Sequence, residues 1–241
     1  MLKYFYTVSL CILTTAFVVA QPAKQAAIFF KKGVQLEQKG LLPDAITAYK
    51  KAISLNKKYD SAYLALALVY AKNSKVDSAI ITLKNALAVN PQFANGYVAL
   101  GNIYRDNLNK PDDAIESYLT ATKIDSSNKI TFYSLAWCYN AKNYYREAIT
   151  YGVKALEIDN NYRPAYNELG HAYHMLKAYQ EGVDQFKKNL AISVNDLPML
   201  YTGYCYMELN QKENALKTYE ELNKINPKMA EALKKRLDAM K

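Results

Sequence analysis

Cysteine is scarce in this chain, and so are glycine, proline, histidine and tryptophan. The 241 residues include 3 Cys, 8 Gly, 7 Pro, 2 His and 1 Trp. Three cysteines are too few for a disulfide framework, and so little glycine and proline leaves no room for long low-complexity linkers. Hydrophobic residues make up 51% of the chain, which is too many for a disordered protein and enough for a sizeable core.

Several catalytic and cofactor motifs are missing as well. The sequence has no glycine-rich phosphate loop, no Cys-x-x-Cys, no His-Glu-x-x-His and no Gly-x-Ser-x-Gly. Cys138 and Cys205 are expected to be small buried side chains rather than reactive thiols. We therefore expect a protein that is not an enzyme, needs no cofactor and takes no small-molecule substrate.

The first 20 residues have the pattern of an export signal. They read MLKYFYTVSLCILTTAFVVA, with a cation at Lys3, an apolar stretch, and small side chains at Val18 and Ala20. This pattern predicts a signal peptide, residues 1–20, cleaved after Ala20. An uncleaved anchor, which would attach the chain to a membrane, is the alternative. No Asn-x-Ser/Thr site follows residue 20, so we expect the periplasm or cell envelope of a bacterium, with secretion as second choice.

Tyrosine is abundant, with 22 residues, because many tyrosines belong to a repeat. The pattern Tyr-x2-Leu-Gly/Ala-x2-Tyr recurs about every 34 residues, with Phe replacing the first Tyr in one copy. Its clearest copies begin at Tyr63, Tyr97, Phe132 and Tyr166. Apolar residues at three- and four-residue steps, split by breakers such as Asn73-Ser74, predict two amphipathic helices per copy.

This pattern resembles the tetratricopeptide repeat (TPR). The resemblance implies an all-α fold, an α-α superhelix (TPR solenoid) of about twelve helices plus a C-terminal capping helix. After a short segment, 21–25, six copies fill residues 26–229, and residues 230–241 are expected to form the cap. The six copies are 26–59, 60–93, 94–128, 129–162, 163–195 and 196–229.

Small residues at fixed slots are expected to let the helices approach closely. Gly33 and Gly101 represent this slot on the first helix of a copy, and Ala79 represents the matching slot on the second helix. Aromatic side chains are expected to fill the space between copies. A leucine in place of Gly101 or Ala79 should overpack the contact.

In the family that the pattern resembles, the first helix of each copy lines a concave surface that binds partners. Aromatic rings and amides on that surface suit an extended peptide, because rings bury apolar side chains and amides bind the peptide backbone. The alternative is that Trp137 packs on a neighbouring helix and binds nothing. Carried over slot by slot, the predicted groove residues are Asn102, Arg105, Tyr133, Trp137, Asn140, Asn167, His171, His174 and Tyr204.

These residues predict a non-enzymatic scaffold or adaptor of the cell envelope, which binds a peptide or helix of a protein partner in the groove. The first alternative is a glycan-handling module that stacks sugars on Tyr133, Trp137 and Tyr204. The second is a metal or enzyme site at Glu168, His171 and His174, for which ligands three residues apart drift around the helix. The formal net charge is +9, yet the lysines fall on second helices and loops, so no nucleic-acid partner is expected.

Overall fold

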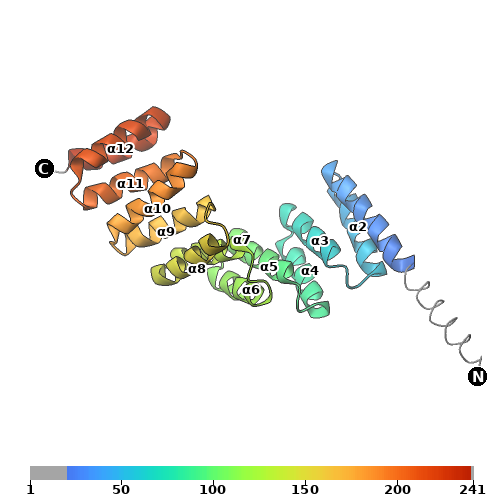
Figure 1. Ribbon diagram of the computed structural model, residues 1–241. Helices are drawn as coiled ribbons and strands as arrows, with labels where there is room; N and C mark the ends of the chain where they lie inside the picture. The colour runs from blue at the N-terminus through green and yellow to red at the C-terminus, as the bar shows by residue number, and fades with distance from the viewer. Residues whose placement is uncertain (1–20, 240–241) are drawn as a thin grey trace, which may run out of the picture. The chain divides into compact units, whose positions relative to one another are not determined.

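A computed structural model describes residues 21–239, and within that range the structure consists of helices and turns without strands (Figure 1). Residues 21–38 are helical, and twelve further helices follow. The helices are α2 (Leu42–Leu55), α3 (Asp60–Lys72), α4 (Val76–Val89), α5 (Ala94–Asp106), α6 (Pro111–Ile124), α7 (Lys129–Ala141), α8 (Tyr145–Ile158), α9 (Arg163–Met175), α10 (Tyr179–Ile192), α11 (Asp196–Glu208), α12 (Lys212–Ile225) and α13 (Pro227–Asp238). The all-α class and the helical-pair arrangement predicted from the repeat are confirmed.

The predicted signal peptide, residues 1–20, lies outside the described residues. Within the described residues, none of the helices combines the length and the apolar character that a membrane crossing requires. The last helix, α13, begins at Pro227, three residues before the predicted cap. Its start is set by Asn226, whose side-chain oxygen accepts a hydrogen bond from the Met229 amide at 3.1 Å.

The chain divides into two compact units. The N-terminal unit ends at Asn109, and the C-terminal unit begins at Lys110. The division lies between α5 and α6, the two helices of the predicted third copy. Each unit is therefore described by itself.

Each pair of helices is joined by a turn that contains one residue in the left-handed conformation. Such a residue ends the first helix and redirects the chain toward the second. Glycine adopts this conformation freely, whereas a side chain makes it costly. The six left-handed residues, one in each turn, are Gly40, Ser74, Asn109, Asn143, Lys177 and Asn210.

Polar bridges close several pairs at the opposite end. Asn90 Nδ2 donates to Asp60 Oδ2 at 2.7 Å, which links the residue after α4 to the start of α3. Two other copies place a bridge at the same two slots. They are Asn226 to Asp196 at 2.7 Å and Lys129 to Asp159 at 2.5 Å.

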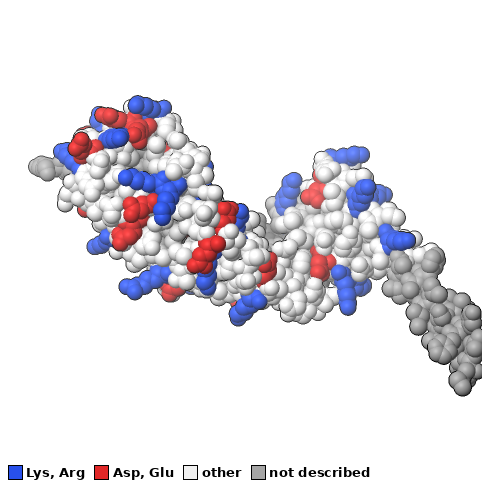
Figure 2. All heavy atoms as spheres, in the orientation of Figure 1, with Lys and Arg blue, Asp and Glu red and all other residues white. Residues whose placement is uncertain are grey.

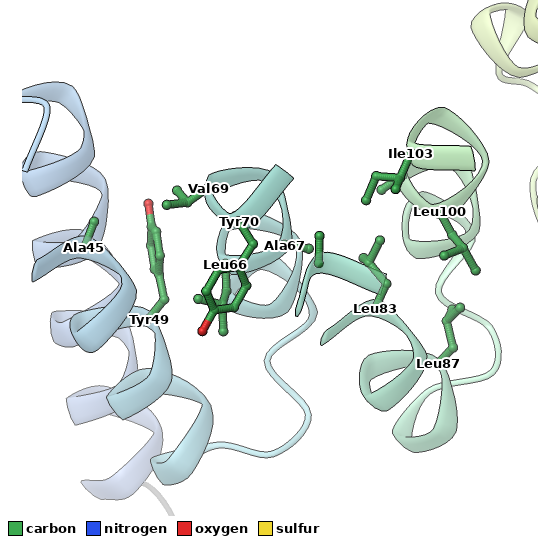
Figure 3. Packing of buried hydrophobic residues seen from close by; sticks show 12 residues of the cluster. Ala45, Tyr49, Leu66, Ala67, Val69, Tyr70, Leu83, Leu87, Leu100 and Ile103 are labelled. Carbon is green, nitrogen blue, oxygen red and sulfur yellow. The ribbon is translucent and has the colours of Figure 1, made fainter. Parts of the chain in front are cut away.

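In the N-terminal unit, the buried core runs from α2 to α5 (Figure 3). The Tyr49 ring is fully buried, and its hydroxyl donates to Glu37 Oε2 at 2.7 Å. A Cβ atom at Gly33 would lie 2.5 Å from that ring. The glycine of the first helix therefore admits the aromatic side chain of the second helix in the same copy.

The C-terminal unit repeats this packing. A Cβ atom at Gly170 would lie 2.5 Å from the Phe186 ring, and one at Gly203 would lie 2.5 Å from Leu233. Aromatic side chains were expected to fill the space between copies, and the structure adds a second location for them. Because the small slot of a first helix has no side chain, Tyr49 and Phe186 also fill the space inside their own copies.

Candidate functional site

A pocket of about 320 Å³ opens in the C-terminal unit. It lies among the first helices of three successive copies, α7, α9 and α11, with one residue from α10. Its lining residues are Trp137, Asn140, Ala141, Asn167, Glu168, His171, Phe186, Leu197, Pro198 and Tyr201.

One wall of the pocket is aromatic. Tyr201 stacks on Phe186, with ring centroids 5.8 Å apart and planes at 19°, and Phe186 is only 2% exposed. His171 meets Tyr201 edge-on at 6.0 Å and Tyr145 edge-on at 6.2 Å. Because each ring is held by its neighbours, the wall loses little side-chain entropy when a ligand is bound.

Two buried amide oxygens lack partners at this pocket. Asn140 is 6% exposed, and its Nδ2 donates to the main-chain oxygen of Glu168 at 3.0 Å and to Glu168 Oε2 at 2.8 Å. These two bonds fix the direction of the amide and leave Asn140 Oδ1 buried without a hydrogen bond. Asn167 Oδ1 is likewise buried without a hydrogen bond. An unmet buried acceptor costs about 1–3 kcal/mol, which a bound donor would recover.

Negative charge at the pocket comes from Glu168, the one lining residue within the described chain with a carboxylate. The pKa of His171 is lowered by burial and by the nearby charge of His174. His171 is therefore uncharged at neutral pH. Lys and Arg are absent from the lining residues of this described pocket.

His174 and Tyr204 lie behind this lining. His174 Nδ1 is 3.4 Å from Cys205 Sγ, and its ring meets Tyr201 at 5.9 Å. Burial lowers the pKa of His174, and burial raises the pKa of the Cys205 thiol to about 12. Tyr204 meets Tyr201 edge-on at 6.0 Å, and the Arg236 guanidinium lies 4.6 Å from the centre of its ring.

The predicted groove residues are thus only partly gathered in one place. Trp137, Asn140, Asn167 and His171 line the pocket, whereas His174 and Tyr204 contact it through Tyr201. Tyr133 packs edge-on against Tyr162 at 5.7 Å, outside the lining. Asn102 and Arg105 belong to the N-terminal unit, where Arg105 Nε pairs with Asp106 Oδ1 at 2.6 Å.

Sequence reasoning missed Tyr201 and Phe186, and it considered Glu168 only as a metal ligand. Glu168 and Tyr201 occupy the same slot in consecutive copies, one residue after the predicted slot of Asn167. A repeat alignment that included this neighbouring slot would have found both residues. Phe186 is a core residue, and it serves the pocket wall as well.

The structure does not bring the three residues of the metal-site alternative together. Among the described residues, no three His, Cys, Asp or Glu side chains come together in a group that could hold a metal ion. Glu168, His171 and His174 therefore do not form such a group. His174 instead faces Cys205, which is fully buried and not in a disulfide.

A second pocket, of about 470 Å³, lies in the N-terminal unit between the helix of residues 21–38 and α2. Its charged residues include two lysines and one aspartate, and its lining residues are Phe29, Lys32, Leu36, Asp44, Thr47, Ala48 and Lys51.

Comparisons with known proteins agree with the repeat pattern. A family model described as "TPR repeat" matches residues 33–74, and models described as "Tetratricopeptide repeat" match residues 64–129, 131–162 and 199–228. A TPR repeat-containing protein of Methanocaldococcus jannaschii is 25% identical over 201 residues, which are 82% of this chain and 30% of that protein. The chain therefore spans less than a third of that relative's length.

Solved structures share the fold. The pilF structure from Pseudomonas aeruginosa has a TM-score of 0.75 at 15% identity, covering 90% of this chain and 99% of that one. PilW, described as a widely conserved type IV pilus biogenesis factor, has a TM-score of 0.72 at 17% identity and covers 86% and 97% of the two chains. YrrB, described as a TPR protein with an unusual peptide-binding site, has a TM-score of 0.61 at 17% identity and covers 82% and 97%. At these identities the similarity shows the fold alone.

Proposed function

Because this chain belongs to the tetratricopeptide repeat family, we propose that it is a non-enzymatic interaction scaffold that binds a peptide segment or helix of a protein partner. The observation that carries the proposal is the pocket between α7, α9 and α11. It combines a rigid aromatic wall with two buried amide oxygens that lack hydrogen bonds. Such a site gains free energy from a ligand that is apolar along one side and carries donors on the other.

The mechanism is binding alone. A side chain of the partner is buried against Trp137 and Tyr201, and donors of the partner reach Asn140 Oδ1 and Asn167 Oδ1. The helices that supply these residues pack on one another, and they form the pocket without a bound partner. Pre-formed pockets bind with a smaller entropy cost than loops that must first become ordered.

We place this scaffold in the cell envelope of a bacterium. The support is the export pattern of residues 1–20, which ends in small side chains at Val18 and Ala20. PilW is named as a type IV pilus biogenesis factor, and that description applies to PilW, whose similarity to this chain is one of fold.

A peptide fits the geometry better than a glycan does. Sugar stacking needs aromatic faces that are open to solvent, but the face of Tyr204 is covered by Arg236 at 4.6 Å. Tyr133 is engaged edge-on with Tyr162 and lies outside the pocket. One of the three rings of the glycan alternative therefore has a face covered by a protein group, and a second lies outside the pocket.

A displayed random-peptide library selected against the purified chain tests this proposal. Fluorescence anisotropy of the selected peptides then measures their affinity for the wild type, for Trp137→Ala and for Tyr133→Ala. We expect Trp137→Ala to lose binding at least tenfold, because hot-spot aromatics contribute about 2 kcal/mol or more. Tyr133→Ala is the matched control on the same helix and should retain binding. Failure to select any peptide, or equal binding by Trp137→Ala, contradicts the proposal.

A further inference from the structure

We propose that the pocket between α7, α9 and α11 recognises a cationic side chain of the partner peptide, and arginine in preference to lysine. This inference rests on the proposed function, since it names the chemistry of the peptide that the pocket binds. Three observations carry it: the polarity of the lining, the burial of its unmet acceptors and its aromatic wall.

The buried polar atoms of the lining that lack hydrogen bonds are both acceptors. They are the two amide oxygens, Asn140 Oδ1 and Asn167 Oδ1, and the lining also includes the Glu168 carboxylate. Within this described pocket no lysine or arginine side chain offers donors in return. An anionic or acceptor-rich ligand would therefore leave the two amide oxygens unsatisfied and be repelled by the Glu168 carboxylate, whereas a donor-rich cation satisfies the oxygens and is attracted by the carboxylate.

The hydrogen bonds of the buried Asn140 amide fix its Oδ1 atom as the acceptor that faces no partner. Its Nδ2 is committed to Glu168, through the main-chain oxygen at 3.0 Å and Oε2 at 2.8 Å. Turning the amide around would break both bonds, so Oδ1 remains the group without a partner. A guanidinium presents five N–H donors in one plane and can reach a carboxylate and a neighbouring amide oxygen together.

The aromatic wall favours the same ligand. Trp137 and the stacked pair of Tyr201 and Phe186 line the pocket beside Glu168. A guanidinium stacks on aromatic faces and is less strongly hydrated than an ammonium, so it loses less when it leaves water. The volume of about 320 Å³ is at the small end of ligand pockets, which suits one long side chain.

The N-terminal pocket provides an internal contrast. Its lining includes Lys32, Lys51 and Asp44, so it carries cations of its own, whereas the described lining of the C-terminal pocket has a carboxylate and no lysine or arginine. The whole chain carries a formal net charge of +9, and its surface has no general attraction for basic partners. Figure 2 shows acidic residues interspersed with basic ones over the face that it draws. Selectivity for arginine must therefore come from the pocket itself.

The test uses blocked pentapeptides, acetyl-Ala-Gly-X-Gly-Ala-amide, in which X is arginine, lysine, citrulline or glutamate. Trp137, the single tryptophan of the chain, reports occupancy through its fluorescence. Citrulline keeps the shape of arginine and loses its charge. We expect saturable binding of the arginine peptide, several-fold weaker binding of the lysine peptide, and binding roughly tenfold or more weaker for citrulline, as for loss of a charge-assisted hydrogen bond.

Two variants with opposite expected effects on the affinity for the arginine peptide distinguish a changed pocket from a misfolded one. Glu168→Gln should weaken the arginine peptide roughly tenfold, and Asn167→Asp, which adds a charge, should tighten it. An unfolded pocket cannot produce tighter binding. Glu157→Gln removes an exposed carboxylate on α8 outside the pocket and is the matched control, with no expected change.

Equal binding of the arginine and citrulline peptides, or preference for glutamate, overturns the charge assignment and leaves peptide binding intact. Selected library peptides whose binding requires Trp137 but which lack basic residues would likewise overturn the charge assignment and leave peptide binding intact. If the library yields no peptide whose binding Trp137→Ala abolishes, and no pentapeptide binds the wild type, the proposed function fails together with this inference.

Discussion

The N-terminal and C-terminal units share a packing rule and differ in what their first helices present. Gly33 faces Tyr49 in one unit as Gly170 faces Phe186 in the other, each at 2.5 Å for an added Cβ. On α3 of the N-terminal unit the prominent side chain is Leu68, which is 49% exposed. The pocket of the C-terminal unit is lined instead by amides, a carboxylate and aromatic rings. The slots that build the fold are shared by the two units, and most residues that line the pocket come from other slots, with Phe186 belonging to both sets.

Two spectroscopic signals separate the units. Trp137 is the only tryptophan of the chain and belongs to the C-terminal unit, so its fluorescence reports on that unit alone. Far-UV circular dichroism reports helices of both units. The predictions below use this separation.

The largest effect is expected from emptying the aromatic slot. Phe186→Ala should lower the free energy of unfolding of the C-terminal unit by about 3–5 kcal/mol, because a cavity replaces a ring that is 2% exposed. Tyr49→Ala should do the same in the N-terminal unit. Urea titrations should show an early Trp137 transition for Phe186→Ala and an unchanged one for Tyr49→Ala. Coincident shifts of both signals in both variants would mean that the units unfold as one.

Filling the small slot is expected to cost less. Gly170→Leu should destabilise the C-terminal unit and Ala79→Leu the N-terminal unit, each by about 1–3 kcal/mol, because both sites are buried against packed side chains. Thermal melts followed by both signals measure the change. Melts that match the wild type would show that these slots are not close contacts.

The repeat made the helices predictable from sequence. The glycine slot at Gly170 follows from the small size that the slot requires, and the breaker at Ser74, which has a φ of 56°, follows from the interruption of the apolar period. The family resemblance, carried over slot by slot, predicted Trp137 and Asn140 as groove residues, and both line the pocket, although Asn140 is only 6% exposed. Tyr201 was missed because the period of a repeat predicts only which face of a helix is buried. Whether a side chain at the edge of that face reaches the preceding helix depends on the angle at which the two helices cross.

The division of the chain near Asn109 had a sequence signal whose meaning was not predicted. The third copy is one residue longer than its neighbours, with the extra residue near Asn107–Lys110, and this is where the two units separate. Composition gave no warning, since no glycine-rich or charged linker marks the place. The unmet oxygens of Asn140 and Asn167 were also beyond sequence reasoning, because they depend on which hydrogen bonds remain after packing.

Turn residues should give a smaller effect of opposite sign in the two units. Lys177 has a φ of 62° in the C-terminal unit, so Lys177→Gly should stabilise that unit by up to about 1 kcal/mol. Gly40 has a φ of 76° in the N-terminal unit with open space around it, so Gly40→Ala should destabilise that unit by about 1 kcal/mol. Urea midpoints measure both. A stabilising Gly40→Ala would show that this turn relaxes.

The smallest effect is a pH dependence confined to one unit. Both histidines, His171 and His174, lie in the C-terminal unit, where burial lowers each pKa below its ordinary 6.5. As the pH falls through about 6.5, these histidines bind protons in the unfolded chain before they do so in the folded chain. The free energy of unfolding of the C-terminal unit should therefore decrease as the pH drops. The urea midpoint of the unfolding transition followed by Trp137 fluorescence should therefore decrease between about pH 7.5 and about pH 5.5. The decrease should be smaller in the double variant His171→Gln/His174→Gln. An equal decrease in that double variant would assign the effect to other groups.

The polar bridges between the two ends of a helical pair have a consequence for how such a chain changes length. Asp60 and Asn90 lie within residues 60–93, and Asp196 and Asn226 lie within residues 196–229. Excising or duplicating one of these segments removes or adds donor and acceptor together, and no carboxylate is stranded at the new junction. Genetic recombination can therefore lengthen or shorten this array one segment at a time without first repairing its hydrogen bonds.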